Sequence, residues 1–136
     1  MQEYRNTGYQ EEKERIFMGI PTKTFEELLV WQKAHKLVLS IYSSTMRFPK
    51  EELYGLVSQI RRSSISVAAN IAEGYRKRTR VDKQRFLTIA HGSLEETRYY
   101  LILSRDLGYC DISKMMSLLE EISKLLTLYY RKIATV

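Results

Sequence analysis

The sequence predicts an all-α protein folded as an antiparallel up-down-up-down four-helix bundle. In four long segments, apolar residues recur at alternating steps of three and four, as they do on one face of a helix. No segment shows the strict apolar–polar alternation that is typical of a strand. Only a few residues connect the segments, and short connections favour antiparallel neighbours. We therefore expect an N-terminal tail over residues 1–23 and the bundle over residues 24–134.

Local sequence signals delimit the first two predicted helices. Thr24 and Glu27 form a capping box that can satisfy unpaired backbone N–H groups at the start of the first helix. The second helix is expected to begin at Pro49, since a proline in the first turn costs no hydrogen bond. It is expected to end near Gly74, a suitable left-handed position after a helix. The apolar stripes are Trp31, Ala34, Val38, Ile41, Thr45 and Phe48, then Leu53, Leu56, Ile60, Ser64, Val67 and Ile71.

The third and fourth predicted helices carry the clearest periodicity. Thr79 and Asp111 can cap their N-termini with side-chain oxygens. Gly108 follows the last apolar residue of the third helix and suits a left-handed position there. The stripes are Leu87, Ala90, Leu94, Thr97, Leu101 and Ser104, then Ile112, Met115, Leu119, Ile122, Leu126, Tyr129 and Ile133.

Several apolar residues lie outside these stripes. They are Ile65, Ala69, Ala72, Ile89 and Leu103, together with the adjacent pairs Tyr99-Tyr100 and Tyr129-Tyr130. Two adjacent tyrosines cannot both point inward on one helix. We expect self-association to cover this second apolar surface; the alternative is that the tyrosines lie along the surface of a single copy.

Composition limits the class of protein. Charged residues make up 28% and hydrophobic residues 44% of the 136 residues, ordinary values for a folded domain. No apolar run approaches the roughly 18 residues that a membrane span needs, and the N-terminal residues lack the apolar core of a signal peptide. We expect a cytoplasmic protein with no membrane partner. The lone Cys110 cannot form an internal disulfide, which agrees with a reducing compartment.

No group of residues predicts catalysis, a metal site or a cofactor. His35 and His91 do not complete the Glu-x-x-His spacing of a di-iron bundle. The pairs Glu95-Glu96 and Glu120-Glu121 are of a kind usually solvated on charged helices. The six glycines stand alone and form no phosphate-binding loop. We therefore expect no catalytic residue, no cofactor and no small-molecule substrate.

The net charge of +6 is concentrated in a single window. Between positions 61 and 85 lie eight cations and two acids, so these 25 residues account for the excess charge of the whole chain. The cations are Arg61, Arg62, Arg76, Lys77, Arg78, Arg80, Lys83 and Arg85. Such local concentration is typical of a polyanion-binding surface, whereas solubilising charge is usually spread over a protein.

The predicted connection between the second and third helices would present most of these cations. Arg76 to Arg78 precede a helix N-terminus, where free N–H groups and the helix dipole already attract phosphate. Arg61 and Arg62 would lie roughly 18 Å from the end of the second helix, a span of several phosphates. Tyr75 is a candidate for stacking on an unpaired base. The alternative is a solvated loop with no ligand.

Asn70 and Glu73 are polar residues near the end of the second predicted helix. Asn70 interrupts an apolar run, and a buried amide without partners costs roughly 1–3 kcal/mol. Glu73 stands at a helix C-terminus, where the dipole disfavours an anion. We expect the two side chains to pin this helix end to a neighbouring helix or subunit; a catalytic role for the carboxylate is the weaker alternative.

Four stretches of the chain resemble a known family. They are "LLVWQKAHKLVLSIY", "FPKEELYGLVSQIRRSSISVAANIAEGYRKRTR", "GSLEETRYYLILSRDLGY" and the leucine-rich C-terminal segment. The sequence is similar to the four-helix bundle proteins encoded in intervening sequences of bacterial 23S ribosomal RNA genes. The resemblance covers residues 24–133 and is most specific over residues 58–74.

This resemblance implies a compact bundle that assembles as a ring, typically a homopentamer, with a presumed role in binding RNA or another nucleic acid, RNA being favoured over DNA. It marks Arg61, Arg62, Asn70, Glu73 and Gly74 as residues of the family pattern and implies no reaction. Two hypotheses follow. One is an oligomeric RNA-binding protein that uses the basic window, and the other is an oligomeric protein-interaction scaffold that binds no nucleic acid.

Overall fold

The computed structural model of the protein describes residues 22–134, and within that range the chain is all-helical, with no strand. The predicted fold class is confirmed to this extent. Most of the predicted N-terminal tail, residues 1–21, lies outside the described residues. The elements are the short 3-10 helices η1 (Phe25–Glu27) and η2 (Lys50–Glu52) and the long helices α2 (Leu29–Thr45), α3 (Leu56–Arg76), α4 (Arg80–Asp106) and α5 (Ser113–Ala134).

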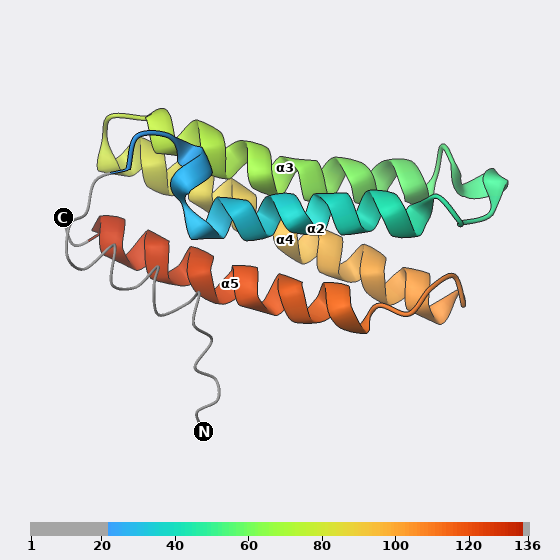
Figure 1. Ribbon diagram of the computed structural model, residues 1–136. Helices are drawn as coiled ribbons and strands as arrows, with labels where there is room; N and C mark the ends of the chain where they lie inside the picture. Colours follow the sequence, from blue (N-terminus) through green and yellow to red (C-terminus); the bar gives the residue numbers. More distant parts are fainter. Residues whose placement is uncertain (1–21, 135–136) are drawn as a thin grey trace, which may run out of the picture.

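The four long helices pack side by side around a common core. Each contacts the next helix in the sequence, and α5 also contacts α2. The helices therefore enclose the core in their order along the chain. Figure 1 shows the α3–α4 connection at one end of the molecule and the other two connections at the opposite end. None of the helices within residues 22–134 has the length and hydropathy needed to cross a membrane.

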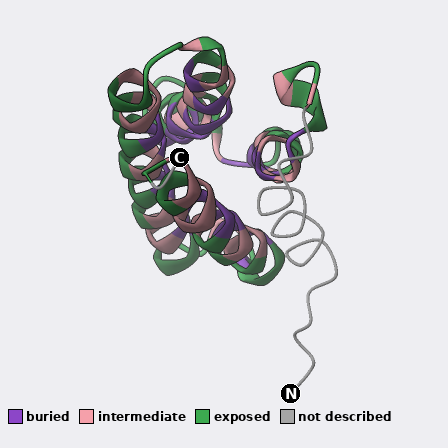
Figure 2. Ribbon diagram, turned by 90° about the vertical axis from the view of Figure 1, so that its left-hand side faces the viewer, coloured by how far each residue is buried: buried purple, intermediate pink, exposed green. Residues whose placement is uncertain are grey.

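The core consists of residues from all four long helices. Figure 2 shows the buried residues facing the centre of the bundle and the exposed residues facing outward. The largest of the fully buried side chains are Leu37, Ile41, Ile60, Ile71, Leu87, Leu94, Leu101, Leu119, Ile122, Leu125 and Leu126. All six predicted stripe residues of α4 are buried, as predicted. In α2, Val30 and Leu37 belong to the core although they were not in the predicted stripe. The predicted residues Trp31 and Val38 are only half-buried.

The predicted starts of the first two helices are wrong. Thr24 precedes η1 and makes no side-chain cap, and α2 begins only at Leu29. Pro49 likewise leads into η2, and α3 begins after Gly55. Neither residue makes a side-chain cap, and each precedes a single 3-10 turn, which begins with unpaired N–H groups just as an α-helix does.

The two glycines predicted to follow helices have different roles. Gly108 adopts a φ of 79° directly after α4, as predicted for a left-handed position. Gly74, however, lies inside α3 and is buried. A Cβ atom added there would lie 3.0 Å from Cβ of Phe86, so Gly74 allows α4 to approach α3 closely.

The predicted N-terminal cap of α4 is confirmed, whereas Asp111 lies one residue before the N-cap position of α5 and bonds the first residue of that helix. Thr79 Oγ1 accepts a hydrogen bond from the backbone N–H of Asp82 at 3.1 Å. Asp111 Oδ1 accepts from both the N–H and the hydroxyl of Ser113, at 2.9 and 2.6 Å. These bonds stabilise the carboxylate and hold the pKa of Asp111 below its usual value.

Candidate nucleic-acid interface

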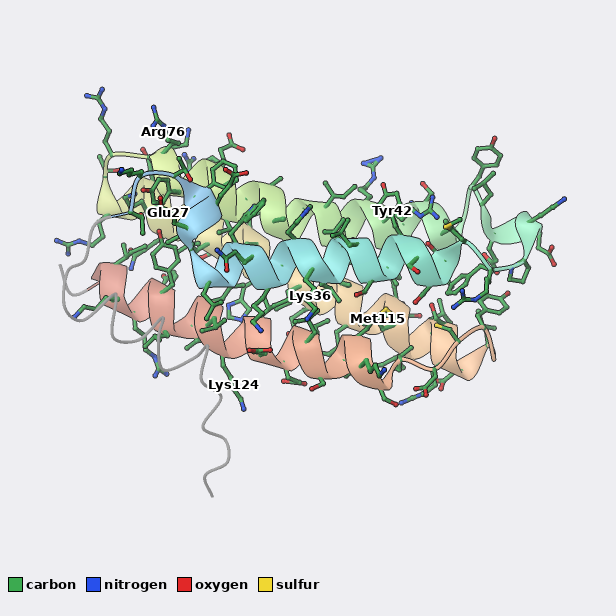
Figure 3. All side chains as sticks on the ribbon, in the orientation of Figure 1. Glu27, Lys36, Tyr42, Arg76, Met115 and Lys124 are labelled. Carbon is green, nitrogen blue, oxygen red and sulfur yellow. The ribbon has the colours of Figure 1, made fainter. Side chains whose placement is uncertain are left out.

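Six of the eight predicted cations gather at the end of the molecule that carries the α3–α4 connection. We call this surface the cationic end; it comprises Arg76, Lys77, Arg78, Arg80, Lys83 and Arg85. It covers the last turn of α3, the connection and the first turns of α4. Figure 3 shows Arg76 at this end and Tyr42 toward the opposite end.

Three arginines of the cationic end are exposed and available to a ligand. These are Arg76, Arg78 and Arg80. Within residues 22–134, no hydrogen bond, ion pair or ring contact engages any of their side chains. Unpaired guanidinium groups in water keep all their N–H donors for an incoming anion, and their planar geometry suits phosphate.

The other three cations of the cationic end make contacts within the protein. Lys77 Nζ lies 4.8 Å from the ring centroid of Phe86, and the Arg85 guanidinium lies 5.4 Å from the same centroid. Arg85 also pairs with Asp82 at 3.3 Å, an exposed contact of the kind that contributes little to stability. Lys83 Nζ donates to the Tyr75 carbonyl at 2.8 Å, and burial lowers the pKa of this lysine. Lys83 therefore connects α4 to the end of α3.

Tyr75, the predicted stacking residue, is not free to bind a base. Its ring packs against the core, and its hydroxyl donates to the Thr22 carbonyl oxygen at 2.8 Å. The same hydroxyl lies 2.6 Å from Thr22 Oγ1. Tyr75 thus fixes the beginning of the described chain beside the cationic end.

Arg61 and Arg62 lie apart from the cationic end. Arg76 lies 14 positions after Arg62 on α3, which corresponds to roughly 21 Å of helix. Arg61 Nε donates to Thr45 Oγ1 at 3.0 Å, and its guanidinium lies 4.3 Å from the ring centroid of Tyr42. Arg62 is exposed. We call these two residues the arginine pair.

Asn70 and Glu73 differ in their surroundings. The Asn70 amide donates to Ser66 O and Ser66 Oγ, at 2.8 and 3.0 Å. The Ser66 hydroxyl lies 2.7 Å from that of Ser93 on α4, so Ser66 connects the two helices, whereas the hydrogen bonds that the Asn70 amide donates stay within α3. Glu73 is exposed, and no hydrogen bond or ion pair joins it to another residue of the described range. It does not pin α3 to a neighbouring helix within the bundle.

The paired glutamates and the histidines serve contacts between and along helices. Arg98 on α4 pairs with Glu95 on the same helix and with Glu120 on α5, and these hydrogen bonds raise the pKa of the arginine. His91 Nε2 lies 3.3 Å from Ser123 Oγ on α5, and His35 stacks on Trp31. Within the part of the chain described, no three His, Cys, Asp or Glu side chains are placed to hold a metal ion.

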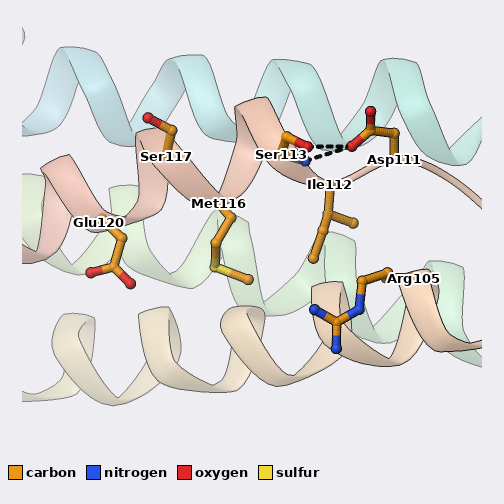
Figure 4. A pocket seen from close by; sticks show the side chains of 7 residues that line it. All are labelled: Arg105, Asp111, Ile112, Ser113, Met116, Ser117 and Glu120. Carbon is orange, nitrogen blue, oxygen red and sulfur yellow. Dashed lines mark hydrogen bonds between the residues drawn. The ribbon is translucent and has the colours of Figure 1, made fainter.

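A shallow hollow between α4 and α5 has charged groups that are already engaged (Figure 4). Asp111 is bonded to Ser113, Arg105 pairs with Asp106 at 2.9 Å, and Glu120 pairs with Arg98. Ile112 and Met116 supply its apolar lining. The charged residues of this hollow therefore contribute to hydrogen bonds and ion pairs within the protein.

These observations define a four-helix protein with a cationic end and a separate arginine pair. Residues 26–130 match the family model described as "23S rRNA-intervening sequence protein". The match covers most of the chain, and the protein belongs to this family, as its sequence predicts. No curated protein matches the sequence.

A solved structure is also similar. It is the crystal structure of a protein of unknown function from the S23 ribosomal protein family of Bacteroides thetaiotaomicron. The two chains are 27% identical, with a TM-score of 0.67, and the similarity covers 76% of this chain and 96% of the other. This similarity supports both the helical fold and the family, and it names no activity.

Proposed function

We propose that the protein is a non-enzymatic, cytoplasmic RNA-binding protein that contacts RNA phosphates through the cationic end of an antiparallel up-down-up-down bundle. The observation that carries this proposal is the concentration of charge. One end of an otherwise neutral molecule holds six cations, and three of them, Arg76, Arg78 and Arg80, have no partner within residues 22–134.

The proposed contact is to the RNA backbone. Arg76, Arg78 and Arg80 supply exposed guanidinium groups, and Lys77 adds a half-buried cation over Phe86. Such contacts position a nucleic acid without reading its bases. The family description refers to an intervening sequence of 23S ribosomal RNA and names no ligand, and from this association we choose structured RNA rather than DNA as the proposed ligand.

The salt dependence of RNA binding tests this proposal. Four phosphate contacts, made by the three free arginines and Lys77, predict a slope of log affinity against log salt of about −3 to −4. The affinity of nuclease-treated protein for a ribosomal RNA hairpin should then fall roughly a hundredfold between 50 and 200 mM salt. Fluorescence anisotropy with a labelled hairpin measures the affinity at each salt concentration. Absence of binding at 50 mM salt would contradict the proposal and favour a protein-interaction scaffold.

We further propose that the chain forms a homo-oligomer, with a pentamer as the expected state. The support is exposed apolar surface on α4: Ile89 is 45% and Tyr99 57% exposed. Burial of such residues between copies would remove apolar surface from water. Light scattering at micromolar concentration should give about five times the monomer mass, and a monomeric mass would rule out this assembly.

A further inference from the structure

The arginine pair borders a second surface hollow, formed by the end of α2, the turn after η2 and the start of α3. Its volume is about 490 Å³. Leu53 and Ile65 form part of its apolar lining, and both are substantially exposed. Arg61 and Arg62 are its charged residues, and none of the residues that line it is acidic. The nearby Glu52 carboxylate is engaged, because it accepts hydrogen bonds from the Tyr109 hydroxyl and the Leu56 N–H.

Arg61 is held in a fixed position at the hollow. Its Nε donates to Thr45, and its guanidinium stacks on the Tyr42 ring. Within residues 22–134, no hydrogen bond engages its terminal Nη groups. A guanidinium whose position is set by a stack and one hydrogen bond loses little conformational freedom when its remaining donors bind an anion.

Tyr54 stands at the edge of the hollow on the turn before α3. It is 90% exposed, the most exposed of the large apolar and aromatic side chains in the described range. Both faces of its ring are therefore accessible to solvent. An aromatic ring in this setting can stack on a nucleobase, and the adjacent cations can contact the attached phosphate.

We propose that this hollow binds an unpaired nucleotide of RNA, with the base stacked on Tyr54 and the phosphate held by Arg61 and Arg62. Charge complementarity favours an anion over other occupants, since the lining holds two cations and no acid. The apolar lining and the free ring favour an anion that carries a flat, hydrophobic group. A nucleotide has both an anionic phosphate and a flat base. This inference rests on the proposed RNA-binding function and adds a preference for single-stranded segments.

Two RNA probes separate this site from the cationic end. They are a 12-nucleotide oligouridylate and a 12-base-pair RNA duplex, and binding of both to the full chain is measured by anisotropy. Tyr54→Ala should lower affinity for the oligouridylate about tenfold, because one stacked base is lost. Affinity for the duplex should change less than about twofold, since paired bases cannot stack on the ring. Arg62→Gln should weaken oligouridylate binding and flatten its salt slope by about 0.7.

Two matched variants test whether the loss of affinity is due to the Tyr54 ring. Tyr54→Phe keeps the aromatic ring and should retain the affinity of the unmodified protein. Leu39→Ala removes another exposed apolar side chain, on α2 and outside the hollow, and should leave oligouridylate binding unchanged. Suppose that the unmodified protein binds both probes, and that Tyr54→Ala changes neither affinity or lowers both affinities equally. That result would refute the nucleotide site but leave the proposed function standing. A change in oligomeric mass on Tyr54→Ala would identify the hollow as a contact between copies and also refute it. If the unmodified protein binds neither RNA, the proposed function fails together with this inference.

Discussion

Replacement of Arg76, Arg78 and Arg80 with glutamate is expected to lower the affinity for a structured RNA hairpin by about two to three orders of magnitude at 0.1 M salt. Each phosphate contact releases counterions and contributes roughly eightfold in affinity at this salt concentration. The three arginines have no partner in the described chain, so their replacement breaks no internal contact. The slope of log affinity against log salt should flatten by about three.

A second triple variant controls for net charge. Lys36, Arg47 and Lys114 are exposed cations that line a hollow between α2 and α5. Their replacement with glutamate changes the net charge by the same amount, and we expect hairpin affinity to stay within a few-fold. Equal losses in both variants would show that total charge, rather than the cationic end, governs binding. Circular dichroism should show that both variants keep their helical content.

Gly74→Val is expected to lower the free energy of unfolding by about 2–3 kcal/mol. A Cβ at position 74 would lie 3.0 Å from Cβ of Phe86 and 3.6 Å from the Lys83 carbonyl oxygen. Both atoms are fixed by the backbone of α4, so no side-chain rotation relieves the contact. The branched valine side chain adds further crowding, and α3 and α4 must move apart. Urea denaturation at a fixed protein concentration measures the loss.

The other helical glycine of this helix pair provides the control. A Cβ added at Gly92 on α4 meets no atom within 4 Å. Gly92→Ala should therefore stabilise the protein by about 0.5–1 kcal/mol, because alanine has the higher helix propensity. If Gly74→Val unfolded at the same urea concentration as the unmodified protein, close α3–α4 packing would not depend on Gly74.

Periodicity predicted the helices well because it reflects burial along a whole face. The stripe from Leu87 to Ser104 is buried at all six positions, since its spacing fits the core side of α4. Single capping residues were less informative. Thr24 and Pro49 lead into 3-10 turns, and Gly74 allows close packing instead of a left-handed turn. Each of these residues suits more than one local structure, and packing selects among them.

The cationic end was visible in the sequence because its six cations lie within ten consecutive residues. The contacts that each cation makes were not visible in the sequence. Lys83, for example, reaches the Tyr75 carbonyl only when α4 packs against α3. The contacts of Arg61 with Tyr42 and Thr45 likewise join two helices, and the exposed Tyr54 gave no periodic signal. Helix formation and charge clustering depend on residues close together in the chain. Which cations remain free, and which aromatic rings stand beside them, depends on how the helices meet.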